Sequence, residues 1–238
     1  KFDIANSEHI DAEREKQNIY WDCYRGYVQN PSDETFRNWG AVEPEASFHD
    51  IEKMYYEDHY SDFIKGQNAR NEKNRHPERN RTTEDLLKNK MTCPEETIFQ
   101  IGKEGEHISG EQLFHIADSF MKRFEGMFGD HVHILNFALH MDETTPHIHE
   151  RHVFDCENKY GELCPQQEKA LEEIGFELPD PSKKQGKNNN RKMVFDDYMR
   201  QHFIMKCHKF GIEVESEAIY GGRQYLEKQD YIIQKQQE

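Results

Sequence analysis

Residues 109–155 read SGEQLFHIADSFMKRFEGMFGDHVHILNFALHMDETTPHIHERHVFD, and this stretch decides the fold that we expect. It opens with a capping box from Ser109 to Gln112, and an apolar stripe then recurs every three or four residues as far as Gly129. This spacing predicts an amphipathic helix. Residues 131–139 and 147–155 predict two strands, and the short turn between them, which contains Pro146, makes them antiparallel neighbours.

Further elements are expected on both sides of this stretch. Residues 97–102 (TIFQIG) predict a strand, and residues 33–42 and 47–65 have helical spacing. Thr83 resembles an N-cap before an acidic first turn. Residues 194–210 predict a helix closed by Gly211, with a strand over 212–214. The order predicts an α+β fold: a central antiparallel sheet with helices packed on one face and long polar loops.

The composition indicates one domain over residues 1–238, because 238 residues are few for two domains and 15 Phe with 11 Tyr can fill a core. The chain begins at Lys1 without Met, so we expect a truncated N-terminus. We expect a polar helix over about 222–238 to lead out of the domain and to support a homodimer through a C-terminal extension, although it has too few heptads to define a coiled coil. No apolar run reaches membrane-spanning length, and five unpatterned cysteines suit a cytoplasmic protein.

The net charge of −15 disfavours nucleic acid on average, but two stretches are basic. Residues 65–81 hold six basic and two acidic residues, and residues 182–192 hold five basic and no acidic residues. We expect both to be mobile loops. Each is either an ordinary solvated loop or a grip on a nucleic-acid backbone. The candidate DNA contacts in the second stretch are Lys183, Lys184, Lys187, Arg191 and Lys192.

Six histidines fall between residues 131 and 152. Residues two apart on a strand share a face, so His147 and His149 project side by side, and His140 ends the preceding strand close to them. Three converging imidazoles predict a metal site with open positions, as catalytic metals require. Asp142 and Glu143 lie in the turn beside it, where a carboxylate can fix a tautomer or accept a proton. For the other three histidines we favour ordinary structural roles.

The segment HMDETTPHIH, residues 140–149, resembles the histidine-triad motif of the plasmid mobilisation and recombination (Mob/Pre) proteins, the MobV-type relaxases of the two-histidine (HUH) endonuclease class. A second segment, from Ile10 to Arg14 and then Asn18, is similar to the family's N-terminal IDxxR…N pattern. The order of strand, helix and strand before the triad also matches. The resemblance covers most of residues 10–155.

The resemblance implies a relaxase that nicks and rejoins single-stranded DNA at a transfer origin by transesterification, with a Mn²⁺ or Mg²⁺ ion on the scissile phosphate. It implies that His140, His147 and His149 are the metal ligands and that Glu143 helps to activate the nucleophile. Arg14 and Asn18 would contact DNA. A Lewis acid on a phosphoryl oxygen and a covalent phospho-enzyme suit this reaction.

The nucleophile of this family, a histidine or a tyrosine, belongs upstream of Ile10, where only nine residues precede it. The candidates within the chain are His9, Tyr20, Tyr24 and Tyr27. We take Tyr20 as the catalytic candidate, although in QNIYWDCY it is as easily a core aromatic residue. Two other functions stay open: a degenerate relaxase fold that binds DNA without cutting it, and an unrelated three-histidine metal-dependent hydrolase.

Overall fold

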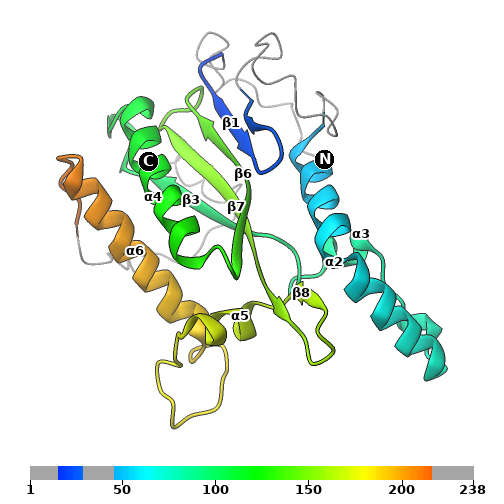
Figure 1. Ribbon diagram of the computed structural model, residues 1–238. Helices are drawn as coiled ribbons and strands as arrows, with labels where there is room; N and C mark the ends of the chain where they lie inside the picture. Colours follow the sequence, from blue (N-terminus) through cyan, green and yellow to red (C-terminus); the bar gives the residue numbers. More distant parts are fainter. Residues whose placement is uncertain (1–15, 29–45, 216–238) are drawn as a thin grey trace, which may run out of the picture.

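The computed structural model describes residues 16–28 and 46–215 (Figure 1). The segment containing His9 and Arg14, the helix expected over 33–42 and the polar helix expected over 222–238 lie outside the described residues. Within the described residues, no helix combines the length and the apolar character needed to cross a membrane.

The sheet is antiparallel, and its central strands carry the histidine motif. Its strand order is β2 (Gly26–Tyr27), β1 (Ile19–Asp22), β6 (Val132–His140), β7 (His147–Glu157) and β3 (Glu95–Gln100). A short strand, β8 (Leu163–Pro165), pairs with the far end of β7. A separate hairpin, β4 (Gly102–Lys103) with β5 (Glu106–His107), follows β3. Each of the two long strands is therefore paired on both sides, which makes β6 and β7 the rigid middle of the sheet.

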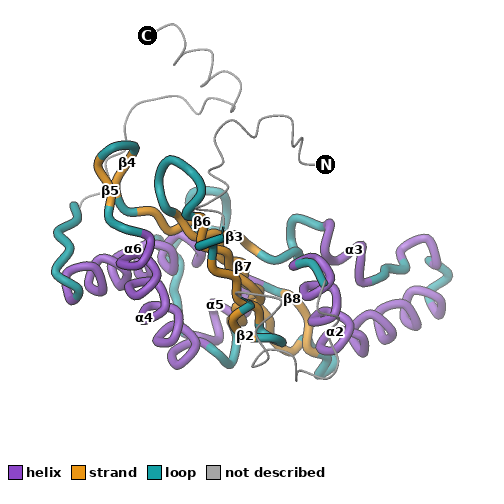
Figure 2. Tube along the Cα trace, turned by 90° about the horizontal axis from the view of Figure 1, so that it is seen from above, coloured by secondary structure: helices purple, strands orange, loops and turns teal. Residues whose placement is uncertain are grey.

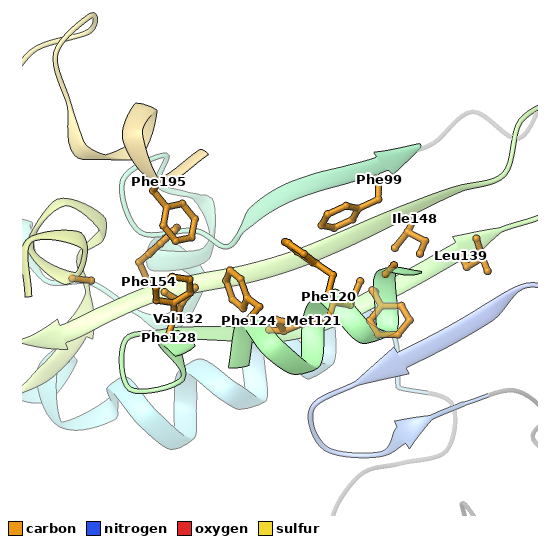
Figure 3. Packing of buried hydrophobic residues seen from close by; sticks show 14 of the residues in the cluster. Phe99, Phe120, Met121, Phe124, Phe128, Val132, Leu139, Ile148, Phe154 and Phe195 are labelled. Carbon is orange, nitrogen blue, oxygen red and sulfur yellow. The ribbon is translucent and has the colours of Figure 1, made fainter. Parts of the chain in front are cut away.

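Three helices cover one face of the sheet: α4 (Gly110–Phe128), α5 (Gln167–Ile174) and α6 (Arg191–Lys209). The apolar stripe of α4 packs on the inward residues of β6 and β7, and α6 packs beside α4 (Figure 3). The residues labelled there are Phe99, Phe120, Met121, Phe124, Phe128, Val132, Leu139, Ile148, Phe154 and Phe195. Burying this many large apolar side chains is the main stabilisation of the sheet.

The other face is covered over part of its area by α2 (Phe48–Lys73), with η3 (Pro77–Arg79) and α3 (Thr83–Lys88) beside it (Figure 2). Tyr55, Tyr56 and Tyr60 of α2 pack against Leu135 and Val153. Leu135 reaches this face because the pairing of β6 with β7 shifts its register between residues 134 and 136. The expected packing of helices on one face therefore describes α4, α5 and α6, while α2 lies on the other.

The strongest sequence patterns are confirmed. Helix α4 has Ser109 as its N-cap with a capping box to Gln112, and it ends at Gly129. Strands β6 and β7 are antiparallel neighbours as expected. Helix α6 ends before Gly211, whose φ of 75° is the left-handed conformation that glycine adopts without strain. The expected α+β class with a central antiparallel sheet is confirmed.

Three expectations were wrong in detail. Residues 65–73 of the first basic stretch belong to α2, so this stretch is not a loop throughout. The N-cap of α3 is Thr82, because its side chain accepts from the Asp85 amide in a capping box. Residues 212–214 form no strand, because the Ile212 amide donates to the Cys207 carbonyl and closes α6.

Candidate metal and catalytic site

The three predicted ligands are brought together where β6 ends and β7 begins. His140 and His147 are direct partners across the β6/β7 ladder, and His149 lies on the same face two residues on. Their ring centres are 5.3 Å (His140–His147), 5.5 Å (His140–His149) and 5.0 Å (His147–His149) apart. Two rigid central strands therefore hold three imidazoles in one cluster on the face opposite α4.

Two of the imidazoles are oriented by acceptors at Nδ1. His149 Nδ1 lies 3.0 Å from Oε1 of Glu96 on β3, and His147 Nδ1 lies 2.9 Å from the Thr145 carbonyl oxygen. A carboxylate or carbonyl oxygen can only accept, so Nδ1 carries the proton in both rings. Each neutral ring then presents the lone pair of Nε2, which is the form in which histidine binds a metal.

His140 is held toward its neutral form. Burial lowers its pKa, the neighbouring His147 and His149 lower it further, and these effects outweigh the opposite effect of Asp142 and Glu143. Its Nδ1 lies 3.8 Å from Oδ1 of Asp142, too far for a hydrogen bond. A neutral imidazole in this place suits a metal ligand.

The donor set fits a divalent ion. With metal–nitrogen distances of about 2.0–2.1 Å, three imidazoles around one ion have ring centres on the order of 5 Å apart, close to the separations above. Among the described residues, however, no three His, Cys, Asp or Glu side chains converge closely enough to hold an ion as they stand. The imidazoles must therefore rotate for three nitrogens to face one ion.

Asn18 ties the turn after β6 to the N-terminal strand. Its Nδ2 donates to Oδ1 of Asp142 at 3.0 Å, and its Oδ1 accepts from the Met141 amide at 2.7 Å. Asn18 is buried, so it serves here as a positioning residue, and its burial does not favour the predicted contact with DNA. On the other side, a Cβ at Gly110 would lie 2.9 Å from Sδ of Met141, so glycine allows α4 to begin against this turn.

The two turn carboxylates differ in exposure. Asp142 is buried and held by Asn18, whereas the Glu143 side chain is 53% exposed. Glu143 Oε2 lies 4.0 Å from Nε2 of His147. An exposed carboxylate next to the cluster can accept a proton from an incoming group, while the buried one shapes the turn.

Tyr20 shares the face of the triad. It pairs with Ala138 on β6, and Ala138 pairs with His149 on β7, so the three residues form one row across the sheet. At about 4.8 Å between strands, Tyr20 lies on the order of 10 Å from His149. Its half-exposed ring packs edge-on against Phe48, and Asn18 Nδ2 lies 3.4 Å from its hydroxyl. Because the side chain of Ala138 is small, it does not fill the space between Tyr20 and the triad.

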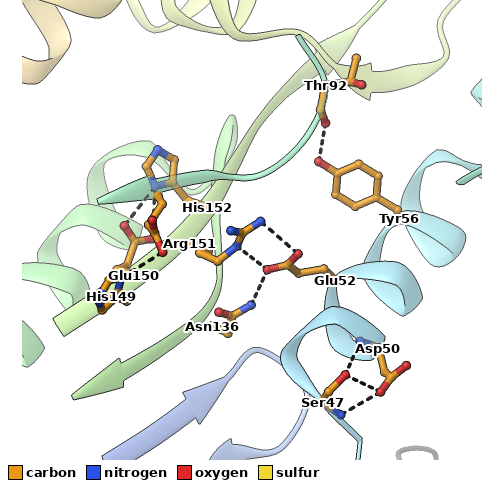
Figure 4. A network of polar contacts seen from close by, with 11 residues as sticks. Ser47, Asp50, Glu52, Tyr56, Thr92, Asn136, His149, Glu150, Arg151 and His152 are labelled. Atoms are coloured by element: carbon orange, nitrogen blue, oxygen red, sulfur yellow. Dashed lines mark hydrogen bonds and ion pairs between the residues drawn. The ribbon is translucent and has the colours of Figure 1, made fainter. Parts of the chain in front are cut away.

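A buried polar network lies in the next row of the same face (Figure 4). Arg151 binds Glu52 of α2 through Nε at 2.6 Å and Nη2 at 3.3 Å, and Asn136 donates to the same carboxylate at 3.0 Å. Burying a charged side chain is costly unless it is paired with an opposite charge and hydrogen-bonded, as these side chains are. The network fixes α2 to the sheet beside the triad, and it accounts for an arginine in the middle of β7.

The remaining three histidines of the cluster have structural partners, as expected. His133 Nε2 lies 2.9 Å from Oδ1 of Asp155, and His131 Nδ1 lies 3.1 Å from the carbonyl oxygen of the same residue. His152 is buried on the α4 face, with Nδ1 3.0 Å from Oε2 of Glu150.

The second basic stretch lies away from the triad. It follows α5, which comes after β8 at the far end of β7, and Figure 1 shows its loop beyond α5. Arg191 binds Glu168, Glu172 and the Phe176 carbonyl oxygen. Lys192 pairs with Glu95 and Asp196, and Lys183 pairs with Asp180.

Lys184 and Lys187 are exposed and make no ion pair with any described carboxylate. Of the five basic residues of this stretch that were predicted to contact DNA, only these two are therefore without an ion pair to a described carboxylate. That this loop binds DNA stays a prediction.

A hollow of about 1220 Å³ lies between β3, α4 and α6, and no triad histidine lines it. Its lining combines apolar side chains such as Phe99, Phe120 and Phe203 with polar ones such as Glu150 and His152.

Sequence reasoning missed Glu96 and Glu52. Neither stands in a motif, and each gains its role from a partner more than 50 residues away along the chain. Only the pairing of β3 with β7 and the packing of α2 reveal them. A single acidic residue, whether on a short strand like Glu96 or on a helix like Glu52, carries no local signal of its contact.

The site is thus of the three-histidine class, on the middle strands of an antiparallel sheet. No protein-family model matches the chain, and no curated protein matches it. Among solved structures, a similar chain is the MobM relaxase domain (MOBV; Mob_Pre), bound to manganese and to 22 nucleotides of plasmid pMV158 oriT DNA. It is 13% identical, with a TM-score of 0.49, over 95% of this chain and 85% of that chain. A likeness of this identity and TM-score carries no argument about the chemistry of this chain.

Proposed function

We propose that this chain is a relaxase-type enzyme that nicks and rejoins one strand of DNA at the transfer origin of a plasmid or other mobile element. The observation that carries the proposal is the cluster of His140, His147 and His149, with ring centres 5.0–5.5 Å apart on two central strands. The motif HMDETTPHIH that supplies these residues supports the same reaction class.

The three histidines would hold a Mn²⁺ or Mg²⁺ ion through nitrogen. When bound, the ion supplies a Lewis acid for a phosphoryl oxygen, and three neutral ligands leave it its full charge. Thr145 and Glu96 keep His147 and His149 in the tautomer that this role needs. Glu96, as the carboxylate behind a ligand, also fixes the ring orientation of that ligand.

The remaining residues would manage the proton and the nucleophile. In the proposed step, the nucleophile forms a bond to phosphorus, the bond from phosphorus to the 3′ oxygen breaks, and the leaving oxygen takes up a proton. Glu143, exposed beside the cluster, would accept the proton that the nucleophile loses. Tyr20 is the candidate nucleophile within the described residues, because it alone of the sequence candidates shares the row of His149 and has an amide donor near its hydroxyl.

Tyr24 and Tyr27 suit this role less well. The Tyr24 hydroxyl donates to Asp58 at 2.6 Å, and the Tyr27 hydroxyl donates to Asp118 at 2.7 Å. Burial and the neighbouring carboxylate raise the pKa of both tyrosines well above the usual value. A phenol held in this way is a poor nucleophile.

A second candidate function is DNA binding without cleavage. The observation that favours it is that, over the described ranges, no three metal-binding side chains converge on one point as they stand. In that case the histidine cluster would be a remnant or a weak ion site, and no covalent adduct would form.

A covalent-adduct assay separates the two functions. The protein is incubated with Mn²⁺ and a randomised pool of end-labelled single-stranded oligonucleotides, and adducts are resolved on a denaturing gel. We expect an adduct that His147→Ala and Glu143→Gln abolish and that Tyr27→Phe retains. If the protein binds Mn²⁺ and the oligonucleotides but forms no adduct, the cleavage function is wrong and the binding function stands.

A further inference from the structure

We propose that residues 65–81, named here the arm, form a second DNA-binding surface that contacts the phosphate backbone away from the histidine cluster. The arm consists of the last turns of α2, η3 and the residues that join them. This inference rests on the proposed function for its choice of DNA as the partner. The net charge of −15 repels DNA on average, so the affinity for DNA must come from a local basic surface. We assign that role to the arm.

The arm projects from the domain. The first half of α2 packs on the sheet through Tyr55, Tyr56 and Tyr60, but beyond Tyr60 the helix buries no further residue. Figures 1 and 2 show its C-terminal half extending past the sheet with α3 beside it. Phe63 and Ile64 still pack against the cluster of Tyr55, Tyr56 and Leu135. Beyond them, the face of the helix that is open to a partner is formed by Lys65, Ala69, Glu72 and Lys73.

The base of the arm is fixed to the domain. Arg70 binds Glu162 through two hydrogen bonds of 2.7 and 2.6 Å, and its guanidinium stacks 4.0 Å from the centre of the Tyr160 ring. Asn68 binds both the amide and the carbonyl of Arg81, so the returning chain is held against α2. These contacts fix Arg70 and the backbone of the returning chain against the domain.

Three uncompensated cations lie along the arm, two at the end of α2 and one on the returning chain. Lys73, Arg75 and Arg81 form no ion pair with any carboxylate of the described residues, although Arg81 helps to lower the pKa of Asp85. Lys73 lies in the last turn of α2, where a cation also interacts favourably with the helix dipole. The helix dipole does not account for the positive charges of Arg75 and Arg81, because both residues come after the helix.

Arg75 occupies a position where glycine would be the easier residue. Its φ is 61°, the one positive φ of a non-glycine residue among those described. The amides of Arg75 and His76 donate to Glu72 and Asn71, which is the Schellman ending that usually has glycine at this position. An arginine in this left-handed conformation is strained where a glycine would not be. We therefore attribute the presence of an arginine at this position to its charge.

A polar hollow of about 630 Å³ lies beside Arg79 and Arg81. Gln67 and Asn71 also line it, together with the carboxylates of Glu78 and Asp85. Within it, Oε1 of Gln67 and Nδ2 of Asn71 are buried and have no hydrogen-bond partner. Buried polar atoms are normally paired, so an acceptor and a donor left open beside arginines suit a nucleotide, which offers both polar base edges and a phosphate.

The position of the arm agrees with a role in holding DNA that reaches the histidine cluster. Phe48, at the start of α2, packs against Tyr20, and Arg70 lies 22 residues further along the same helix. At about 1.5 Å per residue, the arm is on the order of 30 Å from the row of Tyr20. At about 3.4 Å per nucleotide, a single strand of about ten nucleotides spans this distance, so one bound strand can reach both surfaces.

The test measures binding without the reaction. A fluorescein-labelled oligothymidylate is titrated by anisotropy in EDTA at several KCl concentrations, so neither metal nor cleavage contributes. The arm variant is Lys73→Gln/Arg75→Gly/Arg81→Gln. The matched variant removes three charges from the other basic stretch: Lys183→Gln/Lys184→Gln/Lys187→Gln.

We expect the arm variant to bind about tenfold more weakly and its salt slope to fall by about two, since each single-strand phosphate contact contributes about 0.7. The inference is overturned if the arm variant keeps the wild-type slope, or if the wild-type protein does not bind the oligonucleotide. A fall in slope for the matched variant alone would assign the contact to the 182–192 loop. Failure of cleavage in the adduct assay would leave this result unchanged, so the two proposals fail separately.

Arg75→Gly distinguishes a lost contact from a damaged fold. Glycine relieves the positive φ, so the melting temperature should rise by about 2–4 °C while DNA affinity falls. A variant that is more stable and binds less DNA cannot be explained by unfolding. Unchanged affinity in this variant would remove Arg75 from the surface and contradict the proposal at its most specific residue.

Discussion

Nδ1 of His149 on β7 lies 3.0 Å from Oε1 of Glu96, the residue on β3 that pairs with the neighbouring Arg151. Through this contact an edge strand orients a ligand on a central strand. The carboxylate accepts a hydrogen bond from Nδ1–H and leaves Nε2 free. The tautomer and the orientation of the candidate ligand therefore depend on a residue outside the histidine motif.

Removing this contact should weaken metal binding. We expect Glu96→Ala to lower Mn²⁺ affinity by about tenfold or more, and Glu96→Gln to lower it less, because its amide oxygen still accepts from Nδ1. Calorimetry measures the affinity, and ¹⁵N NMR of the imidazoles reports the tautomer. Ile98→Ala is the control, since Ile98 is exposed on the same strand and pairs with His149. Equal losses in the Ala variants at both positions would contradict a specific role for Glu96.

Asn18 should matter to both stability and the site. Asn18→Ala leaves the Met141 amide and the Asp142 carboxylate without their partner, at a cost of about 1–3 kcal/mol in the free energy of unfolding. Denaturant unfolding measures this cost, and Mn²⁺ titration should show weaker binding because the turn beside His140 is released.

Asn68→Ala is the matched control for Asn18. Its side-chain amide likewise makes two hydrogen bonds, both to the backbone of Arg81 in the arm, so this variant should lose stability and keep its Mn²⁺ affinity. Wild-type Mn²⁺ affinity in folded Asn18→Ala would show that the turn does not need this residue.

The buried pair of His152 and Glu150 should make stability depend on pH. Burial lowers the pKa of His152, but Glu150, with a smaller contribution from Glu95, more than reverses this, so the pKa is raised above its usual 6.5. A raised folded-state pKa stabilises the protein below the unfolded value of about 6.5, and this contribution is lost as the pH rises through the folded value.

Urea unfolding at a series of pH values checks this dependence. In Glu150→Gln the hydrogen bond to Nδ1 can persist without the charge, so the pKa of His152 should fall and the loss of stability above the unfolded value should shrink. NMR titration of His152 locates the change. Stability that does not decline above neutral pH, or a pKa of His152 unaltered by this substitution, would contradict the assignment.

The elements that could be predicted from the sequence are those whose signals are local. The capping box at Ser109 and the apolar stripe behind it define α4, and strand alternation places His147 and His149 on one face. Strand β1 was not predicted, because Ile19–Asp22 is short and becomes a strand only by pairing with β6. The helical part of the arm was also missed, because its polar residues gain no stabilisation from a core and have no apolar period.

The site divides in the same way. The candidate ligands follow from spacing within ten residues, whereas Glu96, Glu52 and the packing role of Asn18 depend on contacts between distant segments. Such contacts depend on strand register and on helix packing, and neither can be inferred from a single residue of the sequence. Arg14 lies outside the described residues, so its predicted contact with DNA stays a prediction.

The most direct test of the central claim is a calorimetric titration of Mn²⁺ into the metal-stripped protein and its His147→Ala and His149→Ala variants. His115→Ala, an exposed histidine on α4, is the control. We predict about one ion per chain for the wild type and the control, and none for either triad variant with folding intact. Absence of binding in the folded wild type, or binding that survives both substitutions, would contradict a metal site at the histidine cluster.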